Sequence, residues 1–218
     1  DSAPWRIETQ LRDGTDILVR PVVPEDAALL ELGLRQLSDE ARQLCFMRHV
    51  RALATDELSF LTSPDHSRHE AIGAGALTDG GDGIQPAGVA RYLVDPLHPD
   101  RAEVAVTVVD RFQGRGLGTL LFGLLAAIAA RRGLRALVLL VSSSNDGMRR
   151  LASDLGARIV DGHGPEWEYE LELHLDARAY PDTEAGRIFR EASHLVAFLT
   201  GSRHDVPRER GDASKGRE

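Results

Sequence analysis

Three glycines at alternate positions, Gly114, Gly116 and Gly118, interrupt the middle of the chain and lead directly into a long apolar stretch. Glycine loses more backbone entropy on ordering than any other residue, so a cluster of three needs a reason in the backbone. The segment before it, AEVAVTVV, has the pattern of a strand, and LGTLLFGLLAAIAARRG after it predicts a helix that ends in cations. Glycines between a strand and a helix let backbone N–H groups face an anion. The sequence therefore predicts an anion-binding loop.

Two common nucleotide-binding patterns do not fit this loop. A Walker A loop requires Gly-Lys-Ser/Thr, but Gly118 is followed by Thr119 and Leu120. The dinucleotide pattern G-x-G-x-x-G requires a glycine where Leu121 stands. The pattern that fits is Q-x-x-G-x-G, which begins at Gln113.

The rest of the chain predicts a mixed α/β (α+β) fold with a central sheet flanked by helices. WRIETQL and DILVRPV predict two strands around a turn at Gly14, and Pro24 begins a helix. Ser38 and Thr55 are expected to cap two further helices. EAIGAGAL, AGVARYLV and AEVAVTVV predict three consecutive strands. After the glycine loop and its helix, ALVLLVS predicts a central strand covered on both faces, Asn145 caps a helix, and EWEYELEL predicts a closing strand.

These elements predict one main domain over residues 1–175. Residues 176–201 are expected to form a helical extension whose apolar side carries Ile188, Ala192, Leu195, Val196 and Leu199. Residues 202–218 are polar and mixed in charge, and we expect them to be disordered.

Charge and composition limit the partners of this chain. The formal net charge of −8 argues against broad affinity for nucleic acid or an anionic membrane. The longest apolar run, residues 117–130, is too short to cross a bilayer, and the first residues lack a signal-peptide core. Cys45, the one cysteine, permits no internal disulfide and is expected in the core. The eight histidines lack metal-ligand spacing. We therefore expect a cytoplasmic protein without a metal.

A second block supports a family resemblance. NDGMRRLASDLGA follows the predicted strand LVLLVSSSN, in register through Leu155 and Gly156. With the Q-x-x-G-x-G loop, this block resembles the GNAT superfamily of acetyl-coenzyme A-dependent N-acetyltransferases. The two blocks cover residues 102–157, and the order of strands and helices matches over residues 16–174. VRPVVPEDAALLELGLRQLSDEARQLCFM and GVARYLVDPLHPDRAEVAVTVV resemble the catalytic domain of bacterial protein lysine acetyltransferases. Some of those carry a cyclic-nucleotide-binding module, and no such module fits within this chain.

The resemblance implies a site for acetyl-coenzyme A (acetyl-CoA) as co-substrate. Its pyrophosphate would lie against the N–H groups of residues 114–119, and its pantetheine arm would pair with the preceding strand where that strand splays from its neighbour. A backbone N–H of Val108 or Val109 would stabilise the oxyanion. Asn145 either bonds the pantetheine or serves as an ordinary helix cap. The expected coenzyme residues are Val108, Val109, Gln113, Gly114, Arg115, Gly116, Leu117, Gly118, Thr119 and Asn145.

The resemblance also implies Glu103 as the catalytic base. An amine acceptor must be neutral to attack, and a nearby carboxylate can take its proton. Burial in the apolar run AEVAVTVV would favour proton uptake by Glu103, whereas the alternative is a solvated residue at a strand edge. The family's tyrosine acid, seven residues after the asparagine, is replaced by Ala152. The general acid is therefore missing or supplied from elsewhere.

Three functions remain open from the sequence. The first is acetylation of a lysine side chain on a protein substrate, with a possible homodimer as the assembly. The second is acetylation of a small amine. The third is a catalytically inactive GNAT fold that binds acyl-CoA, which the missing tyrosine favours and Glu103 opposes.

Overall fold

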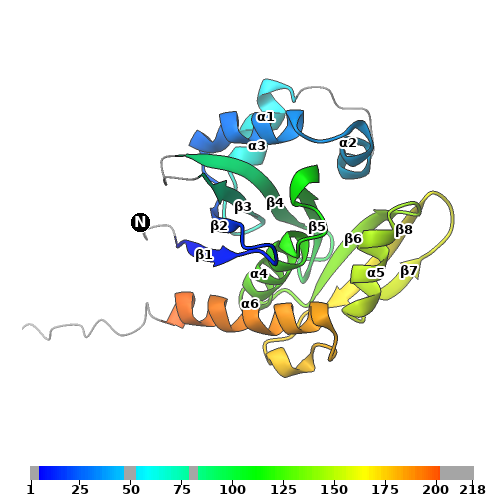
Figure 1. Ribbon diagram of the computed structural model, residues 1–218. Helices are drawn as coiled ribbons and strands as arrows, with labels where there is room; N and C mark the ends of the chain where they lie inside the picture. Colours follow the sequence, from blue (N-terminus) through cyan, green and yellow to red (C-terminus); the bar gives the residue numbers. More distant parts are fainter. Residues whose placement is uncertain (1–4, 47–52, 79–82, 202–218) are drawn as a thin grey trace, which may run out of the picture.

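The computed structural model describes residues 5–46, 53–78 and 83–201 (Figure 1). Its centre is an eight-stranded sheet in the order β1-β2-β3-β4-β5-β6-β8-β7. Strands β5 and β6 are parallel, and the other neighbours are antiparallel. Helices α1 and α3 lie above the sheet in Figure 1, and α4 and α6 lie below it. The predicted mixed α/β fold with a sheet flanked by helices is confirmed.

The N-terminal part follows the sequence closely. Strands β1 (Ile7–Gln10) and β2 (Asp16–Pro21) enclose a turn in which Gly14 has a φ of 83°. A 3-10 turn, Pro24–Asp26, leads into α1 (Ala27–Arg35). Ser38 caps α2 (Asp39–Phe46), because its Oγ accepts from the N–H of Ala41 at 3.1 Å.

One predicted helix cap is wrong. Helix α3 (Thr55–Thr62) includes Thr55 as its first residue, so the cap position falls on Ala54. The carboxylate of Glu57 accepts from the N–H of Ala54 at 2.9 Å. A glutamate in the first turn thus satisfies the N–H of the cap residue, which is a different bond from the one expected of the threonine hydroxyl.

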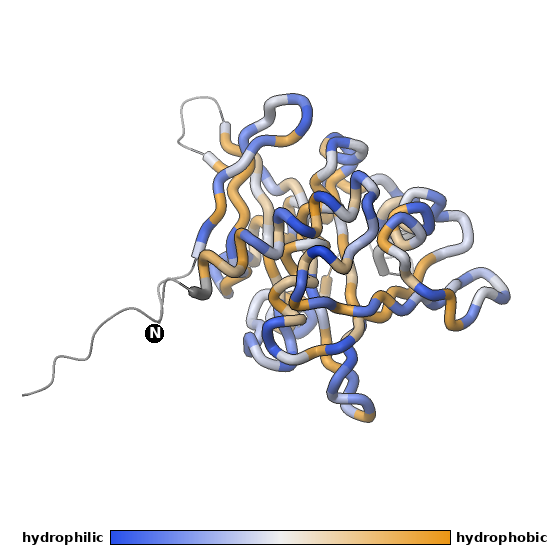
Figure 2. The backbone as a smooth tube through the Cα atoms, turned by 90° about the horizontal axis from the view of Figure 1, so that it is seen from below, coloured by the Kyte–Doolittle hydropathy of each residue, from blue (hydrophilic) through white to orange (hydrophobic). Residues whose placement is uncertain are grey.

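The three central strands are β3 (His69–Leu77), β4 (Ile84–Val94) and β5 (Arg101–Val108). One face of these strands packs on α4 (Leu117–Arg131), which is buried along most of its length. Ala102 and Val104 of β5 lie on that face, so Glu103 and Ala105 lie on the opposite face, with α1 and α3. Figure 2 shows hydrophobic segments gathered in the middle of the molecule and hydrophilic ones around them.

The C-terminal half of the sheet differs from the prediction in two ways. Strand β6 (Ala136–Ser142) is central, but Leu140 is 45% exposed, so one of its faces is not covered as expected. Strand β8 (Glu166–Glu172) does not close the sheet, because β7 (Arg158–Asp161) pairs with its outer edge. Between β6 and β7 lies α5 (Asp146–Asp154).

The amphipathic C-terminal segment forms α6 (Glu184–Gly201), which packs on α4. Its buried hydrophobic residues include Ala185, Phe189, Ala192 and Val196, whereas Leu195 is 39% exposed and was wrongly placed on the apolar side. Gly123 of α4 allows the close approach, since a Cβ there would lie 3.1 Å from the Phe189 ring. The side chain of Cys45 and residues 202–218 lie outside the described part of the chain, so their predictions stay untested.

Candidate active site

The parallel strands β5 and β6 separate soon after they meet. Their register joins Arg101 with Ala136, Ala102 with Leu137, and Glu103 with Val138. Beyond this point β6 continues along β8, while β5 stays paired with β4 as far as Val108. The edge of β5 that faces β6 is therefore open over residues 104–108, and we call this opening the wedge.

The hydrogen-bond alternation of β5 decides which amides face the wedge. The N–H of Val109 donates to the carbonyl of Ala87 at 2.9 Å, which makes Val108 and Gly88 a pair without mutual hydrogen bonds. The N–H and carbonyl of Val108 therefore point away from β4, and Gln113 Nε2 donates to that carbonyl at 3.0 Å. By the same alternation the N–H of Val106 also points into the wedge. Of the two expected oxyanion donors, Val108 is available and Val109 is already engaged.

The glycine loop supplies the second set of amides. Gly114 and Gly116 have φ values of 71° and 90°, in the left-handed region that favours glycine. Gly116 is the cap of α4, and the N–H of Leu120 is the first to donate to a carbonyl of the loop, that of Gly116, at 3.0 Å. The three preceding N–H groups thus lack acceptors within the helix and form its positive end. This end lies against the wedge, since a Cβ added at Gly118 would be in ordinary van der Waals contact with the Val108 side chain at 3.5 Å.

A single cleft of about 730 Å³ joins the wedge to the glycine loop. It is lined by Val106, Thr107, Val108, Gln113, Gly114, Gly116, Gly118, Thr119 and Asn145, among others. This volume lies in the range of small-molecule and cofactor sites. The cleft thus brings together most of the residues that the sequence selected for one ligand.

Three expected contacts lie apart from the cleft. The side chain of Leu117 is fully buried in the core, and Val109 is also buried. The guanidinium of Arg115 forms an ion pair with Asp13 in the β1–β2 turn. The lining of the cleft includes neither Leu117 nor Arg115 nor Val109. What Leu117 and Arg115 can offer a ligand is the backbone N–H.

Two cations line the cleft without having been selected as site residues. Arg12 comes from the turn after β1 and is ion-paired with Glu184 of α6. Arg150 comes from α5, where its neighbour Arg149 instead stacks on Trp167 at 4.2 Å. Nothing in the sequence indicated that Arg12 belongs to the site, because Arg12 is far from the glycine loop along the chain and only the fold brings the two together. Glu184 also lines the cleft and offsets the charge of Arg12, so Arg150 is the stronger of the two attractions for an anionic ligand.

Asn145 serves as the cap of α5, since its Oδ1 accepts from the N–H of Met148 at 3.1 Å. It also lines the cleft, so its role as a helix cap does not prevent it from contacting a ligand there. Ala152 is part of α5 and is fully buried. Among the described residues, no tyrosine lines the cleft.

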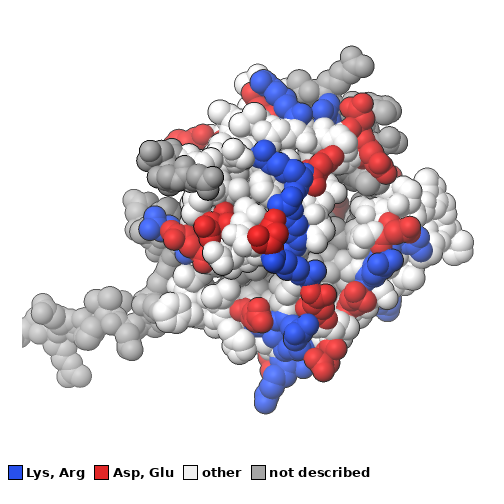
Figure 3. All heavy atoms as spheres, viewed as in Figure 1, with Lys and Arg blue, Asp and Glu red and all other residues white. Residues whose placement is uncertain are grey.

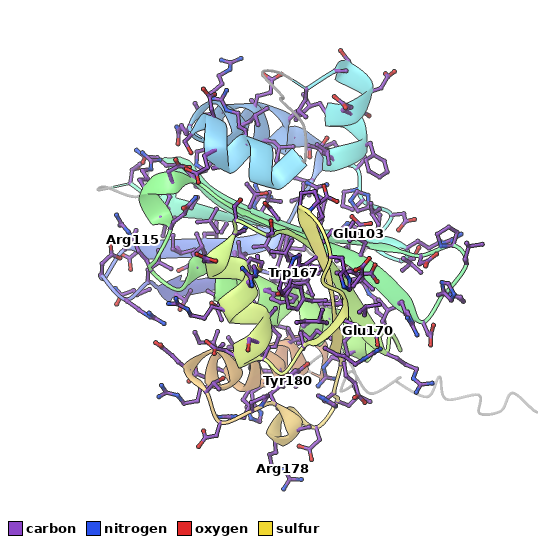
Figure 4. The ribbon with its side chains drawn as sticks, turned by 90° about the vertical axis from the view of Figure 1, so that its right-hand side faces the viewer. Glu103, Arg115, Trp167, Glu170, Arg178 and Tyr180 are labelled. Carbon is purple, nitrogen blue, oxygen red and sulfur yellow. The ribbon has the colours of Figure 1, made fainter. Side chains whose placement is uncertain are left out.

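Glu103 lies at the point where the wedge closes, paired with Leu93 of β4 and Val138 of β6. Its side chain is exposed, so the expected burial is wrong, because this part of the sheet face is open, as the 45% exposure of Leu140 on the same face also shows. Across β6 lies Glu170, whose carboxylate is paired with Arg101 at 2.7 Å and Arg158 at 2.6 Å. In Figure 4 Glu103 and Glu170 lie on one side of the view and Arg115 on the other. Glu103 therefore borders the wedge from a solvent-exposed sheet face.

Charge distribution, metal-ligand grouping and helix apolarity bear on other kinds of partner. Figure 3 shows acidic and basic side chains interspersed on the visible face. Within the described residues, no cluster of three or more His, Cys, Asp or Glu has the arrangement of a metal site. In the same ranges, no helix combines the length and apolarity needed to cross a membrane.

Comparison with known proteins places this geometry in context. Residues 34–157 match the model of the acetyltransferase (GNAT) family. An acetyltransferase of Pseudomonas aeruginosa is 30% identical over 67% of this chain and 77% of its own length. Acetyltransferase Pat of Mycolicibacterium smegmatis is 32% identical over 69% of this chain, which spans 44% of that longer protein. The GNAT domain of S. lividans PAT has a TM-score of 0.69 at 28% identity, covering 78% of this chain and 97% of that domain.

Proposed function

Because this chain belongs to the GNAT family of acetyltransferases, we propose that it transfers the acetyl group of acetyl-CoA to the side-chain amine of a lysine in a protein. The observation that carries the proposal is the cleft, which places two sets of unpaired backbone N–H groups around one space. One set is the start of α4, and the other is the open edge of β5.

The cleft suits both parts of acetyl-CoA. The start of α4 and its two left-handed glycines form a cradle for a pyrophosphate, with Arg12 and Arg150 nearby to offset its charge. The open edge of β5 offers the alternating N–H and carbonyl groups of Val106 and Val108 to an extended amide-bearing arm. The thioester end of the arm would then lie toward the closed end of the wedge, near Glu103.

At that end the residues supply two catalytic functions. The N–H of Val106, which lies nearer to Glu103 than that of Val108, can donate to the carbonyl oxygen as it gains negative charge, and a fixed donor of this kind typically contributes a factor of about 10²–10³ in rate. The carboxylate of Glu103 can take the proton of the acceptor ammonium, directly or through a water. The amine nitrogen then bonds to the carbonyl carbon, the carbon–sulfur bond breaks, and the sulfur leaves as thiolate. The first proton stays on Glu103, and the second proton of the nitrogen passes to solvent as the amide forms. A coenzyme A thiol is acidic enough to leave unprotonated, so Ala152 is compatible with turnover.

The surroundings of Glu103 favour a protein acceptor over a small amine. Glu103 is exposed on an open sheet face, and it does not line the cleft. Small molecules are usually bound in concave sites that bury most of their surface, whereas a lysine on a folded protein must be reached on a convex one. An open face around the base therefore fits a protein partner.

The test combines a single substitution with an unbiased search for the acceptor. Glu103→Gln keeps the shape of the side chain but removes its ability to take a proton, so we expect the rate to fall about 10²–10⁴-fold. Its affinity for acetyl-CoA, measured by calorimetry, should change less than about twofold. Glu172→Gln, an exposed glutamate of β8 on the same sheet face, is the matched control and should keep full activity.

Radiolabelled acetyl-CoA with a cell lysate then identifies the acceptor class. Labelled protein bands that disappear with Glu103→Gln support the proposal. Label confined to small molecules would show a small-amine acetyltransferase, and binding without any transfer would show an inactive acyl-CoA-binding module. Near-full turnover of the Gln variant on a lysine peptide would remove Glu103 as the base.

A further inference from the structure

A second cavity, of about 260 Å³, lies on the other face of β5, between α1 and the sheet. Its walls are mainly apolar and come from α1, α3 and strands β2 to β5. Figure 1 shows α1 above this part of the sheet. The lining includes Leu18, Val22, Leu29, Leu30, Leu34, Leu37, Leu61, Val89 and Ala105. Glycines keep it open: Gly73 and Gly75 of β3 and Gly33 of α1 place no side chain in it.

The polar groups at this cavity are already satisfied by one another. Arg20 and Asp26 form a two-bond ion pair at 2.7 and 2.6 Å. Arg91 donates to the carbonyl of Leu61 at 3.1 Å and lies 3.3 Å from His69 Nε2. Asp26 is the one carboxylate among the described lining residues, and its charge is held by Arg20. The cavity therefore suits an uncharged apolar group and offers nothing to an ammonium.

The cavity meets the coenzyme cleft at one residue. Thr107 of β5 borders both spaces, because it lies on the face toward α1 and also on the open edge of the wedge. Ala105, two residues closer to Glu103, lines the apolar cavity. An acyl group whose thioester lies in the wedge thus has an apolar space beside it on the α1 side of the sheet.

We propose that this cavity is an acyl-chain pocket, and that the protein accepts donors with an uncharged chain longer than acetyl, of about four to six carbons. This inference rests on the proposed function, since it needs the coenzyme in the cleft. The chemistry is unchanged by chain length: the amine nitrogen bonds to the acyl carbon, the carbon–sulfur bond breaks, the base takes the proton, and the thiolate leaves. The pocket decides which acyl group is held at the reacting position.

Calorimetry with a series of acyl-CoA donors, without acceptor, tests the pocket. Burial of one methylene strengthens binding by about fourfold, so butyryl-CoA, which has two more methylenes, should bind the wild-type protein about fifteenfold more tightly than acetyl-CoA. The side chain of Val89 lines the cavity, and Val89→Phe should remove this gain while leaving the affinity for acetyl-CoA within about twofold. Val160→Phe, the same change at a residue of β7 that is 45% exposed and lines neither cavity, is the control.

A second variant guards against misfolding of the first. Gly73 has an ordinary φ, and a Cβ there would lie 3.5 Å from Val22, so Gly73→Leu should fill the pocket from the opposite wall. The inference is overturned if acetyl-CoA binds but butyryl-CoA does not bind more tightly, if both filling variants keep the gain, or if succinyl-CoA binds better than butyryl-CoA. If acetyl-CoA itself does not bind, the proposed function fails first, so the two failures are distinguishable.

Discussion

His69 begins β3 as a buried residue, 5% exposed, with the ring of Phe60 stacked on it at 4.8 Å. Burial, followed by the positive charge of Arg91, holds the pKa of His69 below its usual value near 6.5, although Asp65 and Glu70 act in the other direction. The folded protein therefore favours the neutral imidazole. As the pH falls below about 6.5, the unfolded chain takes up a proton that the folded chain resists, and stability is lost.

This gives a prediction for the pH dependence of stability. His69→Phe keeps an aromatic ring against Phe60 but removes the titrating group. We expect the free energy of unfolding of this variant, measured in urea between pH 7.5 and pH 5, to fall less steeply than that of the wild type. His163→Phe, at a nearly fully exposed histidine, should keep the wild-type slope. Equal slopes in all three proteins would show that His69 does not contribute.

Single residues also show how far sequence reasoning extends. The spacing from Gln113 to Gly118 identified the loop because its chemistry is local: backbone angles and the start of a helix. The choice between Val108 and Val109 was left open, because it depends on which N–H donates to β4. Glu103 was expected to be buried because its strand is apolar, and the strand alone does not show where the covering helices end.

At the scale of elements, the glycine loop and α4 act as one unit. Gly116, at the start of α4, and Gly133, just after its end, have similar φ values of 90° and 86°. Replacing either by alanine forces a side chain into the left-handed region, which costs about 1–2 kcal/mol of stability. Of the two glycines, only Gly116 lines the cleft proposed for the coenzyme.

We therefore expect Gly116→Ala and Gly133→Ala to lower the unfolding free energy by similar amounts but to differ in binding. Gly116→Ala should weaken acetyl-CoA binding about tenfold, or about 1.4 kcal/mol, because the cradle for the phosphates is displaced. Gly133→Ala should bind as the wild type does. Unchanged calorimetric affinity in a folded Gly116→Ala protein would contradict the placement of the pyrophosphate.

Elements differ in how well the sequence specifies them. Ser38 and Asn145 were identified as caps because their side chains bond to the first turn of their own helices. Strand β7 was missed because it is four residues long and exposed throughout, so it lacks the alternation that reveals a strand. Its position is set by pairing with β8, which is a property of the assembled sheet.

At the scale of the whole molecule, the two parts of the sheet meet through three residue pairs of β5 and β6. A ligand in the wedge would contact β5, the glycine loop and α5 together. We expect acetyl-CoA at a hundred times its dissociation constant to stabilise the fold by about 2.7 kcal/mol, which for a chain of this size raises Tm by about 5–10 °C. Scanning calorimetry measures this shift, and it should shrink in Gly116→Ala. A Tm that does not move at saturating coenzyme would contradict binding to the folded state.

The wedge also bears on how copies of this protein avoid aggregating through strand pairing. An unpaired strand edge normally invites a strand from another chain, and exposed edges are a common origin of aggregation. Here the vulnerable edge is placed inside the sheet, bounded by β6 on one side and by the turn into α4 at its end. A strand from another chain could pair only with residues 104–108 of β5, because β6 occupies that edge from Glu103 onward. The gap in which we propose that the coenzyme lies is thus too short to seed a growing stack of chains.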